Sequence, residues 1–272
     1  MMDKIKSLRD ATGAGIMACK SALIENNGDF DKAVEYLRKK GLAAAQKRAG
    51  RETSEGCTRI KTDARGMAAA LLNLGCETDF VAKTDDFKSL ADRLVEHLFA
   101  NPGVTAEDEK LKAIVLEVAP KLGEHIDVKK AEYVKVNGKG ALSYYIHTDN
   151  KKAAIVELQS DTANVTKLQE LGKELALQAV AMTPSWVHRE EVPASVIESE
   201  KDIYRTQAAN EGKPAAAIEK MLEGRLRKFY EQNCLLDQIS IRDSKKTVSQ
   251  FIAEAEKELG APVKVARVER VG

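Results

Sequence analysis

One stretch of this sequence occurs twice: residues 56–78 read GCTRIKTDARGMAAALLNLGCET, and residues 140–162 read GALSYYIHTDNKKAAIVELQSDT. Thr78 aligns with Thr162 at an offset of 84 residues, and the same offset relates Gly56 to Gly140, Leu72 to Val156 and Leu74 to Leu158. In each copy, two segments typical of strands flank a polar turn, which predicts a β-hairpin. The four predicted strands cover residues 58–62, 68–74, 142–147 and 153–158.

The repeat continues beyond each hairpin. Helical patterns follow at 87–99 and 165–181, and each copy then closes with a Leu-Gly pair before a last short strand. Leu122-Gly123 matches Leu259-Gly260 at an offset of 137 residues. We therefore predict an α+β protein whose core consists of two halves, 56–137 and 138–272, each with a three-stranded antiparallel sheet backed by helices.

The second half contains an insertion of about 53 residues, because the two offsets differ by that amount (137 − 84). It falls at about 187–238, where two helical patterns follow Pro193 and Pro214, and proline suits the first turn of a helix. Each pattern has one apolar face, so we expect an antiparallel helical hairpin, a short coiled coil.

The first 41 residues predict a small three-helix domain that resembles ubiquitin-associated domains. Thr12-Gly13-Ala14-Gly15 ends the first helix, Asp29 is placed to cap the third, and Gly41 to end it. Residues 42–55 are rich in alanine and basic side chains, and we expect a linker helix that frays at Gly50. This linker is either solvated or a basic contact strip.

Composition excludes several classes of function. A net charge of +1 and 5% aromatic residues do not favour nucleic-acid binding, and no apolar run is long enough to cross a membrane. No signal-peptide pattern opens the sequence, so we expect a cytoplasmic protein. The four cysteines and four histidines lack metal-site spacing, and no phosphate-binding glycine loop is present. We therefore expect no metal, no cofactor and no enzyme activity.

Acidic residues at 79, 85 and 86 form the one cluster suggestive of acid-base or metal chemistry. Asp85 and Asp86 stand at the start of a predicted helix, where acidic side chains cap free N–H groups and complement the helix dipole. No catalytic dyad accompanies Asp79, so the pattern favours capping. A hydrolase that uses these carboxylates is the alternative.

The segment Cys76–Lys83 joins a predicted buried strand to a helix, and functional residues concentrate in such loops. The repeat offers an internal comparison, because Ala163 and Asn164 replace Asp79 and Phe80 in the second copy. Phe80 therefore either packs in the core, as most aromatic residues do, or is exposed to a partner.

Two longer motifs carry a resemblance that extends over nearly the whole chain. Residues 8–23 read LRDATGAGIMACKSAL, and residues 78–83 read TDFVAK. Together, in this order and spacing, they resemble the two signatures of the translation elongation factor Ts family. Asn73 and Gly75 depart from the usual second signature but leave Asp79 and Phe80 intact. Some members continue past the position of Gly272 into a further helix, whose contact is not expected for this sequence.

The resemblance implies a guanine nucleotide exchange factor that releases GDP from elongation factor Tu. Asp79 and Phe80 would reach the GTPase domain, where the aromatic ring disturbs the Mg²⁺ and phosphate site, with Thr78, Val81 and Lys83 beside them. The resemblance also implies contacts to the same partner by Arg9, Ile16, Met17 and Lys20 of the N-terminal domain, and by Leu122, Gly123 and His147 of the core. The complex would be one-to-one or two-to-two. A ubiquitin-type adaptor built on residues 1–41 is the rival among binding proteins.

Overall fold

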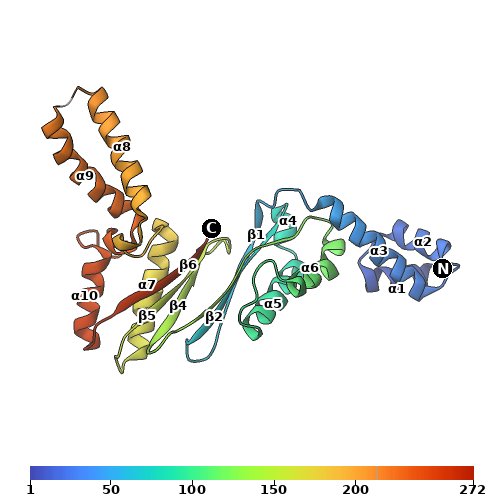
Figure 1. Cartoon of the computed structure of the whole chain (residues 1–272). Coiled ribbons are helices and arrows are strands. Elements are labelled where there is room, and N and C mark those ends of the chain that lie inside the picture. The colour runs from blue at the N-terminus through green and yellow to red at the C-terminus, as the bar shows by residue number, and fades with distance from the viewer. Residues whose placement is uncertain (213) are drawn as a thin grey trace. The chain divides into compact units, whose positions relative to one another are not determined.

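The computed structural model describes residues 1–212 and 214–272, without the side chains of residues 46, 215 and 216. It mixes helices with two three-stranded sheets and divides into two compact units (Figure 1). Unit 1 comprises 1–62, 69–134 and 149–151, and unit 2 comprises 63–68, 135–148 and 152–272. Among the described residues, no helix combines the length and apolar character that a membrane crossing needs.

Three helices open unit 1: α1 (Met2–Thr12), α2 (Ile16–Glu25) and α3 (Phe30–Arg48). Gly13 ends α1 in the left-handed conformation, and the Asp29 side chain accepts the Lys32 N–H at the start of α3, both as predicted. Ile5, Leu8, Leu23, Ala33 and Leu37 form part of a separate small core among these helices.

The predicted end of the third helix at Gly41 is wrong, because α3 continues through it to Arg48. Gly41 is needed for a different reason. A Cβ atom at this position would lie 2.7 Å from Cβ of Pro120, so the glycine allows close approach of α3 to helix α6 (Glu109–Leu122). Lack of a side chain thus serves helix packing here and not helix termination.

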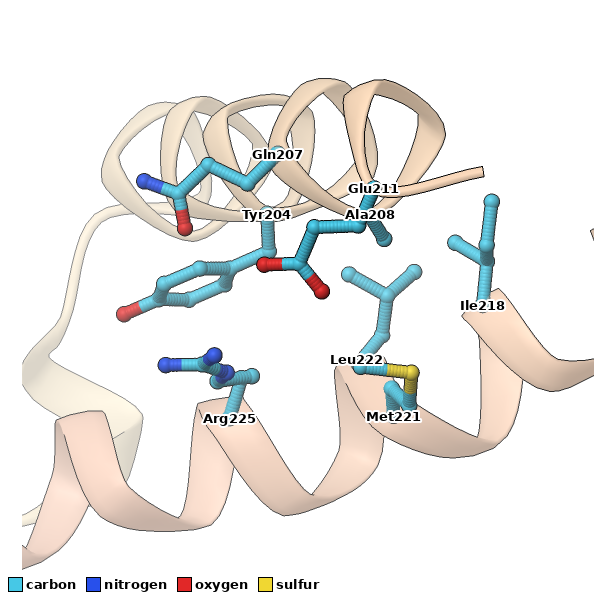
Figure 2. Close-up of a pocket in the computed structure, with 8 residues that line it drawn as sticks. All are labelled: Tyr204, Gln207, Ala208, Glu211, Ile218, Met221, Leu222 and Arg225. Atoms are coloured by element: carbon cyan, nitrogen blue, oxygen red, sulfur yellow. The ribbon is translucent and has the colours of Figure 1, made fainter. Parts of the chain in front are cut away.

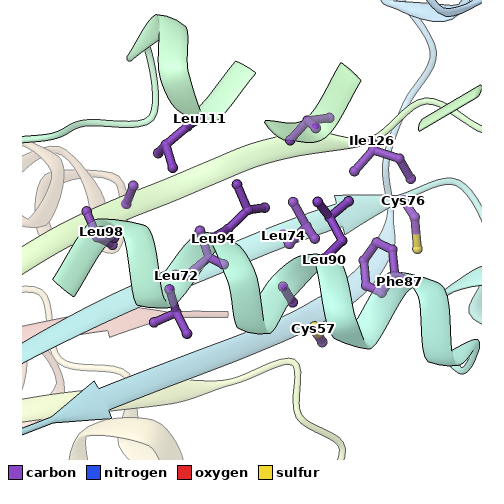
Figure 3. Packing of buried hydrophobic residues seen from close by; sticks show 14 of the residues in the cluster. Cys57, Leu72, Leu74, Cys76, Phe87, Leu90, Leu94, Leu98, Leu111 and Ile126 are labelled. Atoms are coloured by element: carbon purple, nitrogen blue, oxygen red, sulfur yellow. The ribbon is translucent and has the colours of Figure 1, made fainter. Parts of the chain in front are cut away.

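The first sheet has the order β1 (Glu55–Thr62), β2 (Ala68–Cys76), β3 (Asp127–Lys135). Helix α5 (Asp85–Ala100) lies across it, and α6 packs beside α5. Leu72 and Leu74 of β2 face Phe87, Leu90 and Leu94 of α5 in the buried core of unit 1 (Figure 3).

The second sheet repeats this plan with β4 (Gly140–Ile146), β5 (Ala153–Gln159) and β6 (Lys264–Val271), and with helices α7 (Val165–Met182) and α10 (Val248–Leu259). Gly56 and Gly140, paired by the repeat, have φ of 146° and 156°. At each position a Cβ atom would lie 2.0 Å from the carbonyl oxygen of Leu74 or Leu158 on the neighbouring strand. The predicted repeat of hairpin, helix, helix and strand is confirmed.

The insertion forms a helical hairpin of α8 (Ala194–Asn210) and α9 (Ala215–Asn233), flanked by the short helices η1 (Arg189–Glu191) and η2 (Leu235–Asp237). Pro193 and Pro214 stand immediately before their helices, so both helices follow the prolines as predicted. Between the two helices, Tyr204 and Arg225 lie on opposite sides of a small pocket, with 5.8 Å from the guanidinium to the ring centre (Figure 2).

Candidate functional site

The segment between β2 and α5 forms a single helical turn, α4 (Asp79–Ala82), that sequence analysis did not predict. The Thr78 side chain caps it by accepting the Val81 N–H, at 3.3 Å. Val81 and Ala82 pack against the core of unit 1, whereas the Phe80 side chain is 78% exposed. The core-packing alternative for Phe80 is therefore wrong, and the ring is available to a partner.

Asp79 is held within its own turn by Lys83, whose ammonium donates to the carboxylate at 2.6 Å. This hydrogen bond is the main reason why the pKa of Asp79 lies below its ordinary value. Asp86 pairs with Lys121 at 2.7 Å, and Thr84, not Asp85 or Asp86, caps α5 by accepting the Phe87 N–H. Asp85 and Asp86 lie in the first turn of α5, where they complement its dipole as predicted, but the predicted capping role belongs to Thr84. No group of three or more potential metal ligands occurs among the described residues.

Glu124 connects the loop to the end of α6. One carboxylate oxygen accepts the N–H groups of Glu77 and Thr78 at 3.0 and 3.1 Å, and the other accepts the Thr78 hydroxyl at 2.6 Å. A fourth bond runs the opposite way, because the Glu77 carboxylate accepts the N–H of His125 at 2.7 Å. The loop and the residues that follow α6 are therefore joined by four hydrogen bonds.

Leu122 and Gly123 directly precede this junction. Leu122 is the last residue of α6, and Gly123 ends the helix with φ of 75°, a left-handed conformation that glycine adopts without strain. The structure thus brings these two predicted contact residues beside the Thr78–Lys83 segment, although about 40 residues separate them in the sequence.

A second exposed surface lies on the N-terminal helices. Ile16 is 51% exposed and Met17 is 70% exposed, and the side chains of Arg9 and Lys20 are also exposed. Ile24 is exposed as well and lies on the same face of α2 as Ile16 and Lys20, at the spacing of helix turns. Large apolar side chains that are exposed together on one face are typical of contact surfaces.

His147 follows β4 in unit 2. Its N–H donates to the Lys152 carbonyl at 2.8 Å, which closes the β4–β5 hairpin, and its half-buried ring lies edge-on to Tyr145 with 6.4 Å between ring centres.

Comparison with known proteins gives one family. The family model described as "Elongation factor TS" matches residues 77–271. Elongation factor Ts of Clostridium botulinum (strain Alaska E43 / Type E3) is 41% identical over 275 residues, which cover 98% of this chain and 90% of that protein. The chain belongs to the elongation factor Ts family. Family members from Chlorobium phaeobacteroides (strain BS1), at 41% identity, and Clostridium acetobutylicum, at 40%, each align with 96% of this chain and with 94% and 88% of their own lengths.

Membership in the elongation factor Ts family gives the protein a role in translation elongation. The structure groups the predicted residues of unit 1 into two sets, a partly exposed one around α4 with Leu122 and Gly123, and an exposed one on α1 and α2. Sequence reasoning missed Glu124 and Ile24. The position of Ile24 one turn beyond Lys20 could have revealed the second, but no local pattern connects Glu124 to Thr78.

Proposed function

We propose that this elongation factor Ts is a guanine nucleotide exchange factor for elongation factor Tu. It binds the GDP-bound partner, disturbs the site that holds Mg²⁺ and phosphate, and promotes release of GDP so that GTP can bind. The exposure of Phe80 on a fixed helical turn is the observation that supports this most directly. An aromatic side chain of this size remains in water only at a steep cost unless a partner covers it.

This function requires no catalytic acid, metal or cofactor in the protein itself, which acts as a binding partner and not as an enzyme. A protein that binds the nucleotide-free state of a GTPase more tightly than the GDP-bound state must weaken GDP binding by the same factor. In our proposal, Phe80 and Asp79 act on the nucleotide site, with Thr78, Val81 and Lys83 supporting them. The partner is anchored by the exposed set on α1 and α2, by Leu122 and Gly123 at the end of α6, and by His147.

The hydrolase alternative receives no support from the carboxylates, because Asp79 and Asp86 are each paired with a lysine. The adaptor alternative places all binding on residues 1–41 and leaves the exposure of Phe80 unexplained.

Release of a fluorescent GDP analogue from elongation factor Tu tests the proposal. The wild-type protein should accelerate GDP release strongly. The acceleration by Phe80→Ala should be at least about tenfold smaller, as expected when an aromatic anchor that the partner would bury is removed. Ile203→Ala is the matched control, because it truncates another large apolar side chain that is 47% exposed, on α8 in unit 2. This control should release GDP at the wild-type rate.

A folded wild-type protein that leaves GDP release unchanged would contradict the exchange function. Equal acceleration by wild type and Phe80→Ala would retain the function but remove Phe80 from its centre. A fragment of residues 1–41 that binds elongation factor Tu as tightly as the full chain would favour the adaptor alternative.

A further inference from the structure

The carboxylate of Glu124 accepts hydrogen bonds from three donors just before α4, the helical turn that contains Phe80. It accepts hydrogen bonds from the N–H groups of Glu77 and Thr78, which lie beyond the end of β2, and from the Thr78 hydroxyl. Because the hydroxyl proton points to Glu124, an oxygen lone pair of Thr78 is left to accept the Val81 N–H and cap α4. Glu124 thus sets the direction of the hydroxyl that begins the turn.

The turn needs this external support because it is very short. A helix of four residues gains too few internal hydrogen bonds to offset the ordering of its backbone. Its only apolar anchors are Val81 and Ala82, which pack on the core, while Phe80 points to solvent. Without an anchor at its beginning, the backbone that carries Phe80 would sample many directions.

The second copy of the repeat lacks both the turn and the carboxylate. Ala261 occupies the position that matches Glu124, and the hydroxyl of Thr162, the counterpart of Thr78, donates to the Leu259 carbonyl at 2.9 Å. Asn164 then caps α7 directly, with no separate helical turn before it. The carboxylate therefore occurs only in the copy that presents an exposed aromatic ring.

We infer that Glu124 is a positioning residue for nucleotide release: it fixes the backbone of residues 77–81 so that Phe80 is presented in its binding direction before the partner arrives. Fixing this segment in advance removes an ordering cost that binding would otherwise carry. The inference rests on the proposed exchange function and adds to it a residue that acts through Phe80.

The test combines GDP release with amide hydrogen exchange on the full-length protein. Glu124→Ala should accelerate GDP release about tenfold less than the wild-type protein does. The amides of residues 77–81 should exchange faster with solvent in this variant. Glu124→Gln should retain most of the acceleration and of the amide protection, because its carbonyl can accept the two N–H groups, and the Thr78 oxygen has two lone pairs that can accept from the glutamine amide and from the Val81 N–H. The double variant with Phe80→Ala should be no slower than Phe80→Ala alone, since Glu124 acts through that ring.

Glu117→Ala is the matched control, because it removes an exposed glutamate of α6 that pairs with Arg93 at 2.7 Å, away from the loop. It should leave both measurements unchanged. If Glu124→Ala does not fold, Glu124→Asp replaces it, since it keeps the charge but withdraws the carboxylate by one methylene group.

Three results would overturn the inference: wild-type acceleration by a folded Glu124→Ala, unchanged protection of residues 77–81, or losses that add in the double variant. Failure of the wild-type protein to release GDP would instead contradict the proposed function. In that case the hydrogen-exchange measurement alone still decides whether Glu124 orders the turn.

Discussion

Cys76 ends β2 immediately before the candidate loop, and its thiol is fully buried. The Sγ atom lies 3.2 Å from the Thr78 carbonyl oxygen, to which it donates. Burial, assisted by the negative charge of Glu124, raises the pKa of the Cys76 thiol to about 12. The group therefore stays protonated at neutral and mildly alkaline pH, and it serves as a packing residue with a weak hydrogen bond.

This environment predicts low thiol reactivity. The thiolate is the reactive species, so a raised pKa makes Cys76 resist iodoacetamide at pH 8, and Cys234, with a pKa raised to about 11, should resist it too. Mass spectrometry of native and denatured protein measures the difference. Because unfolded thiols ionise near pH 8.5, the free energy of unfolding contributed by these two groups should decrease as pH rises above that value. Rapid native alkylation of Cys76 at pH 8 would contradict its buried, protonated state.

Two helical glycines have opposite surroundings. Gly41 in α3 lies against Pro120, whereas Gly224 in α9 has open space where a Cβ atom would be. The same substitution should therefore separate helix propensity from helix packing, because both residues lie within helices.

We expect Gly224→Ala to raise the free energy of unfolding by about 0.5–1 kcal/mol, the usual gain for a helix interior. Gly41→Ala should lower it by about 1–3 kcal/mol, because the new methyl group would overlap Pro120 and force α3 and α6 apart. Thermal or urea denaturation followed by circular dichroism measures both. A stabilising Gly41→Ala would show that α3 does not approach α6 this closely.

The regular elements could be predicted from sequence because their patterns are local. Predicted strands at 58–62 and 153–158 correspond to β1 and β5 within three residues, since alternation and turn residues define both ends. Gly41 misled the prediction because a glycine after basic residues fits a helix end and a close helix contact equally well. Only the structure of α6 distinguishes the two.

The candidate site was less predictable for a different physical reason. The motif containing Phe80 could be found in the sequence. Whether its ring is buried or exposed could not be decided there, because exposure depends on packing partners and not on local spacing. The α4 turn is too short to produce a periodic pattern. Glu124 contacts Thr78 across 46 residues, and such pairing follows from the sheet and helix arrangement alone.

Each unit contains its own large hydrophobic core, built on the same order of strands and helices. The helical hairpin contributes little to either. A separate small cluster at its base contains Val192, Phe229 and Cys234. Beyond this base, Ala208 and Leu222 are the buried apolar residues of the described part of the hairpin.

Removal of the outer hairpin should therefore leave the fold intact. Replacing residues 199–226 with a short Gly-Ser linker keeps the basal cluster and removes little buried apolar surface. We expect the main thermal transition to shift by only a few degrees, about the effect of 1 kcal/mol on a chain of this size. A collapse of the transition, measured by calorimetry, would show that the hairpin supports the core of unit 2.

The brevity of α4 also limits how its surface could be imitated. A synthetic peptide copied from residues 76–84 would contain Phe80 but none of the bonds from Glu124, so in water it would be largely unstructured. A covalent cross-link between positions 79 and 83, where Asp79 and Lys83 already meet, would restore the turn and leave the aromatic ring free, although it would consume the Asp79 carboxylate. A peptide inhibitor that imitates this surface should therefore begin from a stapled ring of five residues and not from a linear epitope.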